Sequence, residues 1–597
     1  MWVRFPPPAP VVAVLVVVLG LGLFARLDTW LAFDTDAAYV TYRYAQNVAD
    51  GSGFVYNAHE RVLGTATPLY TLMLAGAARL GLAIPPASAA IGIAAATLAL
   101  VIVALWLTRL TGSGLVGLLA ALVVASQPAF VTAAVSGLET SVYVLALILC
   151  VQLYDRERFA LAALAAAAAT LVRLEGAMAG ASLMLHFIAS RRRPPTIGAT
   201  LGYVLPVLPW LVFSLLYFGE ILPRPLQAIG PSTDSGAMLR QAFGPDLLPL
   251  WPLAIVGALV PLVRRTPASA GLQALALWIA IALASFGLSQ PDLSAWNLAP
   301  LTTAVAVLAV FGAAEIFRVG ETLTPVAPRT RSGVAAAVVV ILPLLAAGTI
   351  RTTRDVEALV ERTSRVEKAR ADAAAFVRRE GQPGDAVTTG AIGIVGWTTR
   401  GPIHDTRGIV TPSATGLRAV DLVARSASPW FITEVDGPSA PTPAVTGYTL
   451  AATFNETAAP TLLVFRRGPA TETSAGMVFT AGISMTSVTL TTDRVEVALT
   501  ADRRLDRHYK IFFHLFEDGI DDDTPTRLLD FDPTTATVGM TPGVTYVSQR
   551  EIAPALSTPL TVVKLGLFDE RDPAYARLTD AKGRSHIVMR LRGPITR

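Results

Sequence analysis

Cysteine and charged side chains are scarce in this sequence of 597 residues. Cys150 is the only cysteine, which excludes an intrachain disulfide and a zinc site made of cysteines. Charged residues make up 15% of the chain, whereas a soluble protein usually carries about a quarter. Long apolar stretches account for this deficit, and they end near residue 350. The composition therefore predicts a membrane-embedded part, residues 1–351, followed by a water-soluble region.

Motifs of several enzyme classes are also absent. The six histidines show no spacing typical of metal ligands, and no Walker loop, nucleophile elbow or zincin motif occurs. We therefore expect neither ATP-driven transport nor serine hydrolysis, and no metal or other cofactor is predicted. The formal net charge is +4, and many of the basic residues, mostly arginines, lie at the ends of apolar segments, with no basic patch interleaved with aromatics. This pattern is typical of membrane topology and not of nucleic-acid binding.

The apolar stretches predict eleven membrane-spanning helices, because about 20 apolar residues are needed to cross the hydrocarbon core. The stretch 159–190 is too long for one helix, and Arg173 and Glu175 interrupt it. A charge at mid-bilayer costs roughly 2.5–3.5 kcal/mol, so we expect two shorter helices that meet at the membrane surface near Arg173. Besides these two, the predicted spans are 9–27, 86–108, 114–135, 138–154, 200–218, 247–263, 270–288, 297–317 and 332–350.

The positive-inside rule indicates how these spans are oriented. If the short segment 68–82 lies in the plane of the interface, the following arginines fall on the cytoplasmic side: Arg109, Arg156, Arg158, Arg191, Arg192, Arg193, Arg264, Arg265, Arg318, Arg329 and Arg331. Several polar segments then share the outer face with the whole C-terminal region. They are 28–85, 136–139, 173–175, 219–246 and 289–296.

The first outer loop carries two aspartates, Asp34 and Asp36, shortly after the first predicted helix. A carboxylate at the membrane surface can remove a proton from an acceptor hydroxyl, and nearby arginines can hold a phosphate leaving group. Arg43 and Arg61 are candidates for that second role. The simpler interpretation is that both aspartates cap the amphipathic helix predicted over 37–49, while the arginines contact lipid headgroups.

Other polar residues on the predicted outer face are candidates for binding a donor sugar or its phosphate. Glu139 is expected either to bind sugar hydroxyls or pair with Arg173, or simply to open a helix, where the helix dipole favours an acid. Arg173 and Glu175 lie at the predicted helix break, where a structural ion pair is the alternative. Arg224 is a candidate phosphate ligand, with snorkelling to headgroups as the competing use. Asp292 either faces the site or is a solvated loop acid.

Six short segments, in a fixed order, carry a resemblance to a known family. In the first loop they are DAAYVTYRYAQN at 36–47, GSGFVYN at 51–57 and ERVLGTATPL at 60–69. SGLET at 136–140, RLEG at 173–176 and YFGEILP at 217–223 follow. Together they resemble the GT-C membrane glycosyltransferases. Within that superfamily the resemblance is to the actinobacterial arabinofuranosyltransferase-like branch, and more distantly to aminoarabinose transferases and protein O-mannosyltransferases.

The resemblance implies a GT-C fold, a polyprenyl-phosphate monosaccharide as the sugar donor and Asp36 as the catalytic base, aided by Asp34. The chain departs from the family pattern at three places. The family usually has a second acid directly after the base, where this chain has Ala37. The loop that begins at Arg224 lacks the usual Asn-Thr, and Asn297 stands where the family carries an arginine.

The soluble region predicts two domains. An amphipathic helix over 352–380 and short strands, among them 392–397, predict an extracytoplasmic α/β domain over 352–468. The polar segment 469–476 is interpreted as a linker. Strand-like runs separated by turns then predict a β-sandwich over 477–597, which resembles jelly-roll, carbohydrate-binding modules. Glycan binding and a purely structural cover are equal alternatives for this domain.

The whole sequence predicts a multi-pass helical membrane protein with about eleven membrane helices and one in-plane helix, in a bacterial plasma membrane. It is expected to move a sugar, with inversion, from a polyprenyl-phosphate donor to a hydroxyl of an extracytoplasmic glycan, lipid or protein, with Asp36 as general base. Because Ala37 replaces the usual second acid, the alternative is a catalytically inactive, membrane-anchored glycan-binding or assembly protein. A passive transporter is a weaker alternative, since the sequence has no repeat with paired broken helices.

Overall fold

The structure is a computed structural model that describes residues 35–191, 195–228, 243–244, 247–264, 269–289 and 295–323, and most of 358–592. Asp34 and Asp292, and the predicted spans 9–27 and 332–350, lie outside the described residues. The chain divides into two compact units. The first contains residues 1–422, 432–439 and 454–462, and the second contains 423–431, 440–453 and 463–597.

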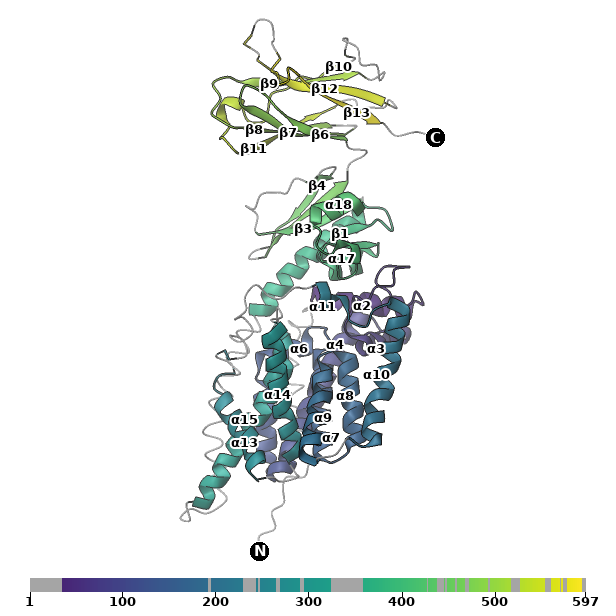
Figure 1. Cartoon of the computed structure of the whole chain (residues 1–597), viewed down its shortest axis with the longest axis vertical. Coiled ribbons are helices and arrows are strands. Elements are labelled where there is room, and N and C mark those ends of the chain that lie inside the picture. Colours follow the sequence, from purple (N-terminus) through teal and green to yellow (C-terminus); the bar gives the residue numbers. More distant parts are fainter. Residues whose placement is uncertain are drawn as a thin grey trace. The chain divides into compact units, whose positions relative to one another are not determined.

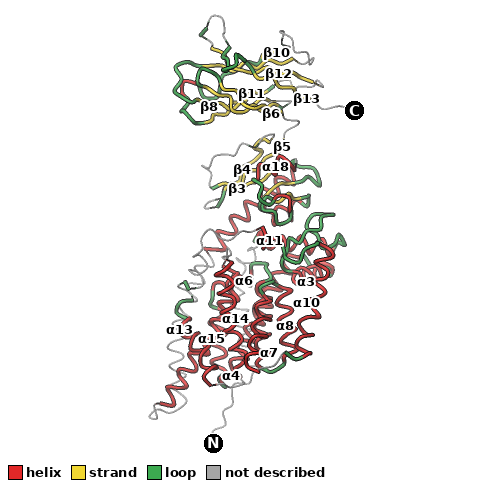
Figure 2. The backbone as a smooth tube through the Cα atoms, viewed as in Figure 1, coloured by secondary structure: helices red, strands yellow, loops and turns green. Residues whose placement is uncertain are grey.

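The first unit is built mainly of apolar helices (Figure 1, Figure 2). Its described helical elements up to residue 323 are α2 (Asp36–Ala49), α3 (Pro68–Arg79), α4 (Ile84–Thr111), α5 (Gly114–Ala125), α6 (Pro128–Val135), α7 (Thr140–Asp155), α8 (Phe159–Val172), α9 (Gly176–Arg191), α10 (Ile197–Phe218), α11 (Arg224–Ala228), α13 (Trp251–Arg264), α14 (Ala270–Ser289), η3 (Ala295–Leu298) and α15 (Ala299–Leu323). Helices suit this composition, because a helix bonds its backbone groups internally and exposes none of them to lipid.

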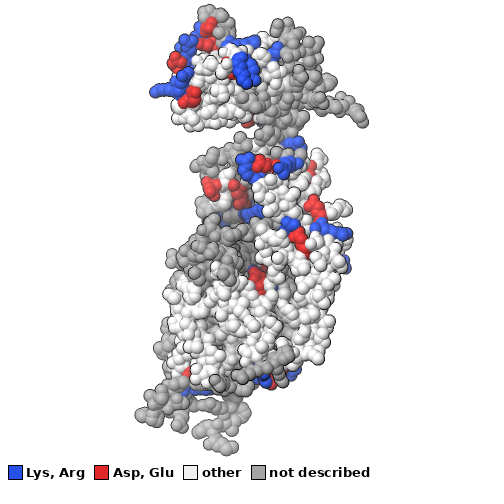
Figure 3. All heavy atoms as spheres, in the orientation of Figure 1, with Lys and Arg blue, Asp and Glu red and all other residues white. Residues whose placement is uncertain are grey.

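The helices identify a multi-pass membrane protein. Within the described residues, four helices are long and apolar enough to cross a membrane, namely α4, α10, α14 and the segment Trp296–Arg318. The pair α5 and α6 makes a fifth if it counts as one span, bent by 70°. The helices α7, α8 and α13 are apolar but shorter. Figure 3 shows that the drawn face of these helices carries few charged side chains. The exact total of eleven spans stays a prediction.

One local prediction for this part is confirmed, and the in-plane position of segment 68–82 stays a prediction. The stretch 159–190 forms two helices, α8 and α9, with the break at Arg173–Glu175. The segment predicted to lie in the interface forms α3, whose 12 residues are too few to span a membrane. A proline at its first position favours a helix start there, since that position needs no hydrogen-bond donor.

Small residues allow the helices to pack closely. At the crossing of α13 and α15, an added Cβ at Gly257 would lie 2.0 Å from the carbonyl oxygen of Leu308. An added Cβ at Gly312 would lie 2.1 Å from the carbonyl oxygen of Leu253. Such close backbone contact replaces the hydrophobic driving force that is missing between helices in lipid.

The basic residues predicted on the cytoplasmic side include two that make ion pairs at helix ends. Arg109 at the end of α4 lies 3.7 Å from the buried Asp155 at the end of α7. Arg191 at the end of α9 pairs with Glu157 in the turn between α7 and α8. These contacts join helix ends that the predicted topology places on one side. Which side of the membrane they face stays a prediction.

A mixed α/β region follows the membrane helices. Its sheet has the order β2-β1-β3-β5-β4, with β1 and β2 parallel. The strands are β1 (Val387–Thr389), β2 (Ile403–Asp405), β3 (Trp430–Val435), β4 (Tyr448–Phe454) and β5 (Thr461–Arg467). The described helical segments are residues 358–380, α17 (Ile392–Thr399), η4 (Pro412–Ala414) and α18 (Ala419–Ser426). The strand predicted over 392–397 is therefore wrong, because these residues form most of α17.

The last part of the chain is a sandwich of two four-stranded sheets, with orders β10-β9-β12-β13 and β11-β8-β7-β6. Its elements are β6 (Glu472–Val478), β7 (Ile483–Leu490), β8 (Arg494–Ala501), β9 (Tyr509–Phe516), β10 (Arg527–Leu528), η5 (Thr537–Gly539), β11 (Thr545–Glu551), β12 (Leu560–Asp569) and β13 (Ile587–Arg592). Alternating apolar residues of both sheets, such as Val497 and Phe513, form one core. The predicted linker over 469–476 is corrected in part, because β6 begins at Glu472. Its small and polar residues suit the edge of a sheet.

Candidate active site

Asp36 is the first residue of α2, and its carboxylate bonds to a helix that is distant in sequence. The Oδ1 atom accepts a hydrogen bond of 2.8 Å from the backbone N–H of Ile394, the third residue of α17. The first N–H groups of a helix have no intrahelical acceptor, and the helix dipole favours a negative charge near them. Asp36 lies in the first turn of α2, as expected, but the helix that its carboxylate caps is α17.

A second acid, Glu367, holds the backbone of Asp36. Glu367 lies in the helical segment 358–380 and is 8% exposed. Its Oε1 atom accepts hydrogen bonds from the N–H of Asp36 at 3.1 Å and from Nη1 of Arg370 at 3.0 Å. Nε of Arg370 donates to Glu434 at 2.7 Å. Burial raises the pKa of the Glu367 carboxyl to about 7, while Arg370 opposes the rise and the charge of Asp36 adds to it.

The helix α17 approaches α2 so closely that only glycine fits at position 393. An added Cβ at Gly393 would lie 1.7 Å from the carbonyl oxygen of Asp36 and 2.9 Å from its Cγ. Aromatic rings pack beside this contact. The ring centroid of Trp397 lies 6.0 Å from that of Tyr39 and 6.1 Å from that of Tyr42. The start of α2 and the whole of α17 therefore form one packed element.

Arg43, predicted to contact the donor phosphate, is buried and bonded to the protein itself. It donates from Nε to the carbonyl of Tyr56 at 2.9 Å, from Nη1 to the carbonyl of Gly396 at 2.8 Å, and from Nη2 to the carbonyl of Gly401 at 2.8 Å. Nη2 also lies 3.3 Å from Oδ1 of Asn57. In this structure the guanidinium ties the first loop to the end of α17. Its contact with a donor phosphate stays a prediction.

Asn57 joins the first loop to the sheet of the α/β region. Its Oδ1 accepts from the N–H of Ile403 at 3.0 Å, and its Nδ2 donates to the carbonyl of Ile403 at 2.9 Å. The side-chain amide therefore pairs with β2 as the backbone of a neighbouring strand would. The hydroxyl of Tyr56 donates to the carbonyl of Ile392. These bonds fix the loop that carries the predicted site against residues 392–403.

Three of the predicted site residues form one ion cluster. Arg173 lies 3.0 Å from Glu139 and 2.9 Å from Glu175, measured between nitrogen and oxygen atoms. Its Nη1 also lies 3.2 Å from Oγ1 of Thr140 and 3.2 Å from Oδ1 of Asn297. Arg173, Glu175 and Asn297 line a cavity of about 10 Å³. The predicted pairing of Glu139 with Arg173 is present. Their contact with sugar hydroxyls stays a prediction.

This ion cluster adjoins the first turn of α2. Thr35, next to Asp36, donates from its hydroxyl to the carbonyl of Ser136 at 3.4 Å, three residues before Glu139. The hydroxyl of Tyr70 in α3 donates to the carbonyl of Gly137 at 3.0 Å. The turn 136–139 thus lies between α2, α3 and the helix break at Arg173. The structure brings Asp36 and the ion cluster to the same end of the helices.

Arg61 and Arg224 lie at the later part of the first loop, near Leu63. The exposed guanidinium of Arg61 stands 4.6 Å from the ring centroid of Tyr217, at the end of α10. Arg224 pairs with Glu220, and its backbone N–H donates to the carbonyl of Leu63 at 2.9 Å. The Nε atom of Arg224 is buried and has no acceptor among the described residues. Arg61 belongs to the first loop and Arg224 borders it, away from the residues of the loop that contact α17.

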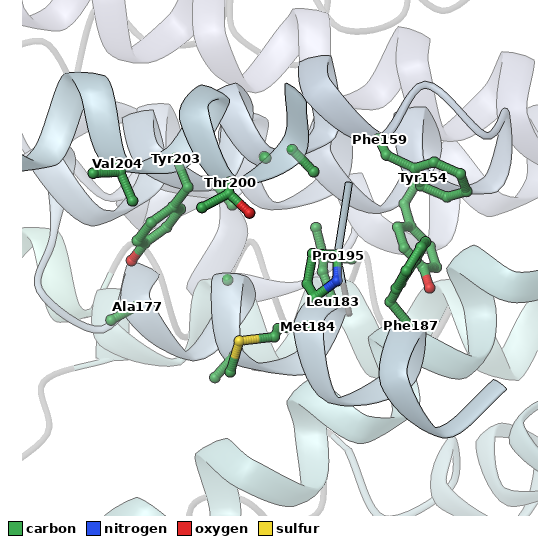
Figure 4. A pocket seen from close by; sticks show the side chains of 15 residues that line it. Tyr154, Phe159, Ala177, Leu183, Met184, Phe187, Pro195, Thr200, Tyr203 and Val204 are labelled. Carbon is green, nitrogen blue, oxygen red and sulfur yellow. The ribbon is translucent and has the colours of Figure 1, made fainter. Parts of the chain in front are cut away.

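Figure 4 shows an apolar cavity of about 360 Å³ between α7, α8, α9 and α10, lined by side chains such as Phe159, Met184, Phe187 and Tyr203. Among the residues described, no three His, Cys, Asp or Glu side chains gather closely enough to hold a metal ion. The predicted site residues Asp34 and Asp292 are not among the residues described.

Comparison with known proteins identifies the fold. Neither a protein-family model nor a curated protein matches the sequence. The solved structure of ArnT from Cupriavidus metallidurans bound to undecaprenyl phosphate matches with a TM-score of 0.54 and 13% identity, over 76% of this chain and 97% of that one. Its apo state matches with a TM-score of 0.50 and 14% identity, over 75% and 97%. The chain has the GT-C fold. The resemblance predicted from the sequence is confirmed at the level of the fold.

Within this GT-C fold, sequence reasoning missed the partners of Asp36. Ile394 contributes only a backbone N–H, which no side-chain motif marks. Glu367 lies 331 residues from Asp36, in a helix whose many charged side chains otherwise suit a solvated face. A weak signal was present in the glycines at 393 and 396, which favour close backbone approach over a regular strand.

Proposed function

We propose that this chain is a membrane glycosyltransferase that moves a sugar from a polyprenyl-phosphate donor to a hydroxyl of an extracytoplasmic acceptor. The observation that carries the proposal is the place of Asp36 in a GT-C fold. Its carboxylate is held at the start of α2, at the end of the helices that also carries the ion cluster of Glu139, Arg173 and Glu175. The matching ArnT structure was solved with undecaprenyl phosphate, which supports a polyprenyl-phosphate donor.

The proposed reaction is a single displacement with inversion. Asp36 removes the proton of the acceptor hydroxyl, and the acceptor oxygen attacks the anomeric carbon from the face opposite the phosphate. The bond between that carbon and the phosphate oxygen breaks, so the products are the glycosylated acceptor and polyprenyl phosphate. Oδ1 of Asp36 is bonded to Ile394, and within the described residues no donor contacts Oδ2. Oδ2 is therefore the atom proposed to take the proton.

The remaining predicted residues divide the other tasks. Arg61 and Arg224 are the proposed phosphate ligands, because one guanidinium is exposed and the other has an unpaired Nε. The ion cluster at Arg173 is proposed to contact sugar hydroxyls at the same end of the helices. The apolar cavity between α8 and α10 offers space for part of a hydrocarbon chain, since its lining is mostly aliphatic and aromatic.

Sugar transfer by purified full-length protein, with a panel of polyprenyl-phosphate sugars, tests this proposal. Asp36→Asn should abolish transfer, and Asp34→Asn should reduce it less. Asp50→Asn is the matched control, because Asp50 is an exposed residue at the other end of α2. If only Asp34→Asn abolishes transfer, the base is the other aspartate. If Asp36→Asn is as active as the control, Asp36 is not the base.

The alternative is a glycan-binding or assembly protein without catalysis. It is favoured by the bonds of Asp36 and Arg43, which give both residues a structural role that needs no substrate. If the wild type consumes no donor and the β-sandwich retains glycan in binding assays, this alternative replaces the enzyme.

A further inference from the structure

The second side-chain oxygen of Glu367 is buried and unpaired. Its Oε1 atom takes both hydrogen bonds, from Asp36 and Arg370, while Oε2 has no partner among the described residues. An ionised carboxylate oxygen that is removed from water without a donor is unfavourable. A buried acid in that position is expected to hold a proton or to face a substrate. Glu367 directly contacts the backbone of Asp36, the proposed base.

We propose that Glu367 is the second acid of this site, a positioning residue that holds the start of α2 and strengthens Asp36 as a base. The inference rests on the proposed function. In the sequence, the place next to Asp36 is taken by Ala37, which is exposed and carries no charge. The structure instead supplies a buried acid that contacts Asp36 from the segment 358–380.

The positioning role follows from the geometry of a helix start. The N–H of Asp36 belongs to the first residue of α2, so it has no acceptor within that helix. Oε1 of Glu367 provides the acceptor at 3.1 Å. Ile394 bonds the side chain of Asp36 while Glu367 bonds its backbone, so the carboxylate is fixed from two sides. Both partners come from the region that follows the membrane helices.

The charge role follows from the groups that face Glu367. They are Asp36 from α2 and Arg370 from its own helix, and Arg370 is shared with Glu434 of β3. With a pKa of about 7, Glu367 is protonated at lower pH and ionised at higher pH. An ionised Glu367 adds a negative charge beside the carboxylate that is proposed to take the acceptor proton. That charge attracts the proton as it leaves the acceptor hydroxyl, which favours general-base catalysis.

The pH dependence of sugar transfer tests the charge role. We expect kcat of the wild type to rise through about pH 7, by roughly three- to tenfold, as Glu367 ionises. Glu367→Gln keeps an acceptor oxygen for the N–H of Asp36 but carries no charge, so its kcat should lack this rise while KM changes little. Glu361→Gln is the matched control, since Glu361 is an exposed acid on the same helix. A rise that persists in Glu367→Gln would overturn the charge role.

Amide hydrogen exchange tests the positioning role without any activity. Glu367→Ala removes the acceptor of the Asp36 N–H, so exchange of that amide should become at least about tenfold faster. Glu361→Ala should leave it unchanged. If the wild type is inactive with every donor, the proposed function fails but this measurement still decides the contact. Equal exchange of the Asp36 amide in the two variants would overturn the proposal.

Discussion

Gly393→Ala tests the docking of α17 on α2 with one methyl group. The new Cβ would lie 1.7 Å from the carbonyl oxygen of Asp36 and 2.5 Å from its carbonyl carbon. Backbone atoms cannot turn aside as the end of a side chain can, so the two helices must separate by roughly 1.5 Å or more to reach an ordinary contact. The 2.8 Å bond between Ile394 and Asp36 then lengthens beyond hydrogen-bonding distance.

The expected cost of this separation can be worked from its two parts. Overpacking costs about 1–3 kcal/mol, and a hydrogen bond to a charged group contributes about 1.5–3 kcal/mol. The same displacement of the helices relieves the overpacking and breaks the hydrogen bond. We therefore expect a total cost of about 3 kcal/mol for the docking of α17 on α2. That energy corresponds to a roughly hundredfold shift toward the separated state. Hydrogen exchange of residues 392–399 should rise accordingly, and sugar transfer should fall by about tenfold or more if α17 orients the base.

Gly76→Ala is the matched control for this substitution. Gly76 lies in α3, and an added Cβ there meets no atom within 4 Å. This control should be neutral or slightly stabilising, because alanine favours a helix by about 1 kcal/mol over glycine. If Gly393→Ala matches the control in exchange and in melting temperature, the described contact is wrong. If exchange changes and transfer does not, the docking is correct but the base does not depend on it.

Two further predictions concern buried charges. The pKa of Glu367 is about 7 in the folded chain against an ordinary value of 4.5, so this residue contributes stability that is full below pH 4.5 and is lost as the pH rises through 7. The difference corresponds to about 3 kcal/mol; thermal melts of Glu367→Gln should lack most of this pH dependence, and an unchanged dependence would contradict the assignment. Arg173→Met should lower the free energy of unfolding by about 3 kcal/mol, because it leaves Glu139 buried beside no cation. Adding Glu139→Gln to Arg173→Met should recover part of that loss, and a melting temperature that falls further would argue against the pairing.

Much of the fold could be predicted from local patterns. The break at Arg173 followed from the cost of a charge in lipid, and the structure ends α8 just before that residue. The shortness of the apolar segment 68–82 predicted a helix that is too short to span the membrane. The alternation of apolar residues predicted the strands of the sandwich. These features depend on each segment alone, so the sequence contains what is needed to predict them.

The details of the site could not be predicted in the same way. The segment 392–399 is only eight residues long, too short for its periodicity to separate a helix from a strand. Its first turn is capped by Asp36, which lies 358 residues away in the sequence. The hydrogen bonds of Arg43 reach the carbonyls of Gly396 and Gly401, 353 and 358 residues away, and its predicted contact with a donor phosphate stays a prediction. Contacts of this kind arise from the tertiary structure and leave no local pattern.

The distribution of charge around α2 argues that the donor phosphate lies away from Asp36. At the start of the helix, Asp36 and Glu367 face one guanidinium among the residues that the structure describes, that of Arg370, which Glu434 already shares. A phosphate is repelled there. Arg61 and Arg224 lie beside the loop that returns to α2 near Tyr44, eight residues along the helix and thus about 12 Å from its start.

That separation fits an inverting reaction. The base and the leaving group must lie on opposite faces of one sugar ring. If the acids and the arginines were in direct contact, no sugar would fit between them. With the acids at one end of α2 and Arg61 and Arg224 toward the other, a monosaccharide between them would present its anomeric carbon to an acceptor hydroxyl at Asp36 and its phosphate to the arginines. The geometry of α2 therefore supports single displacement over a two-step mechanism.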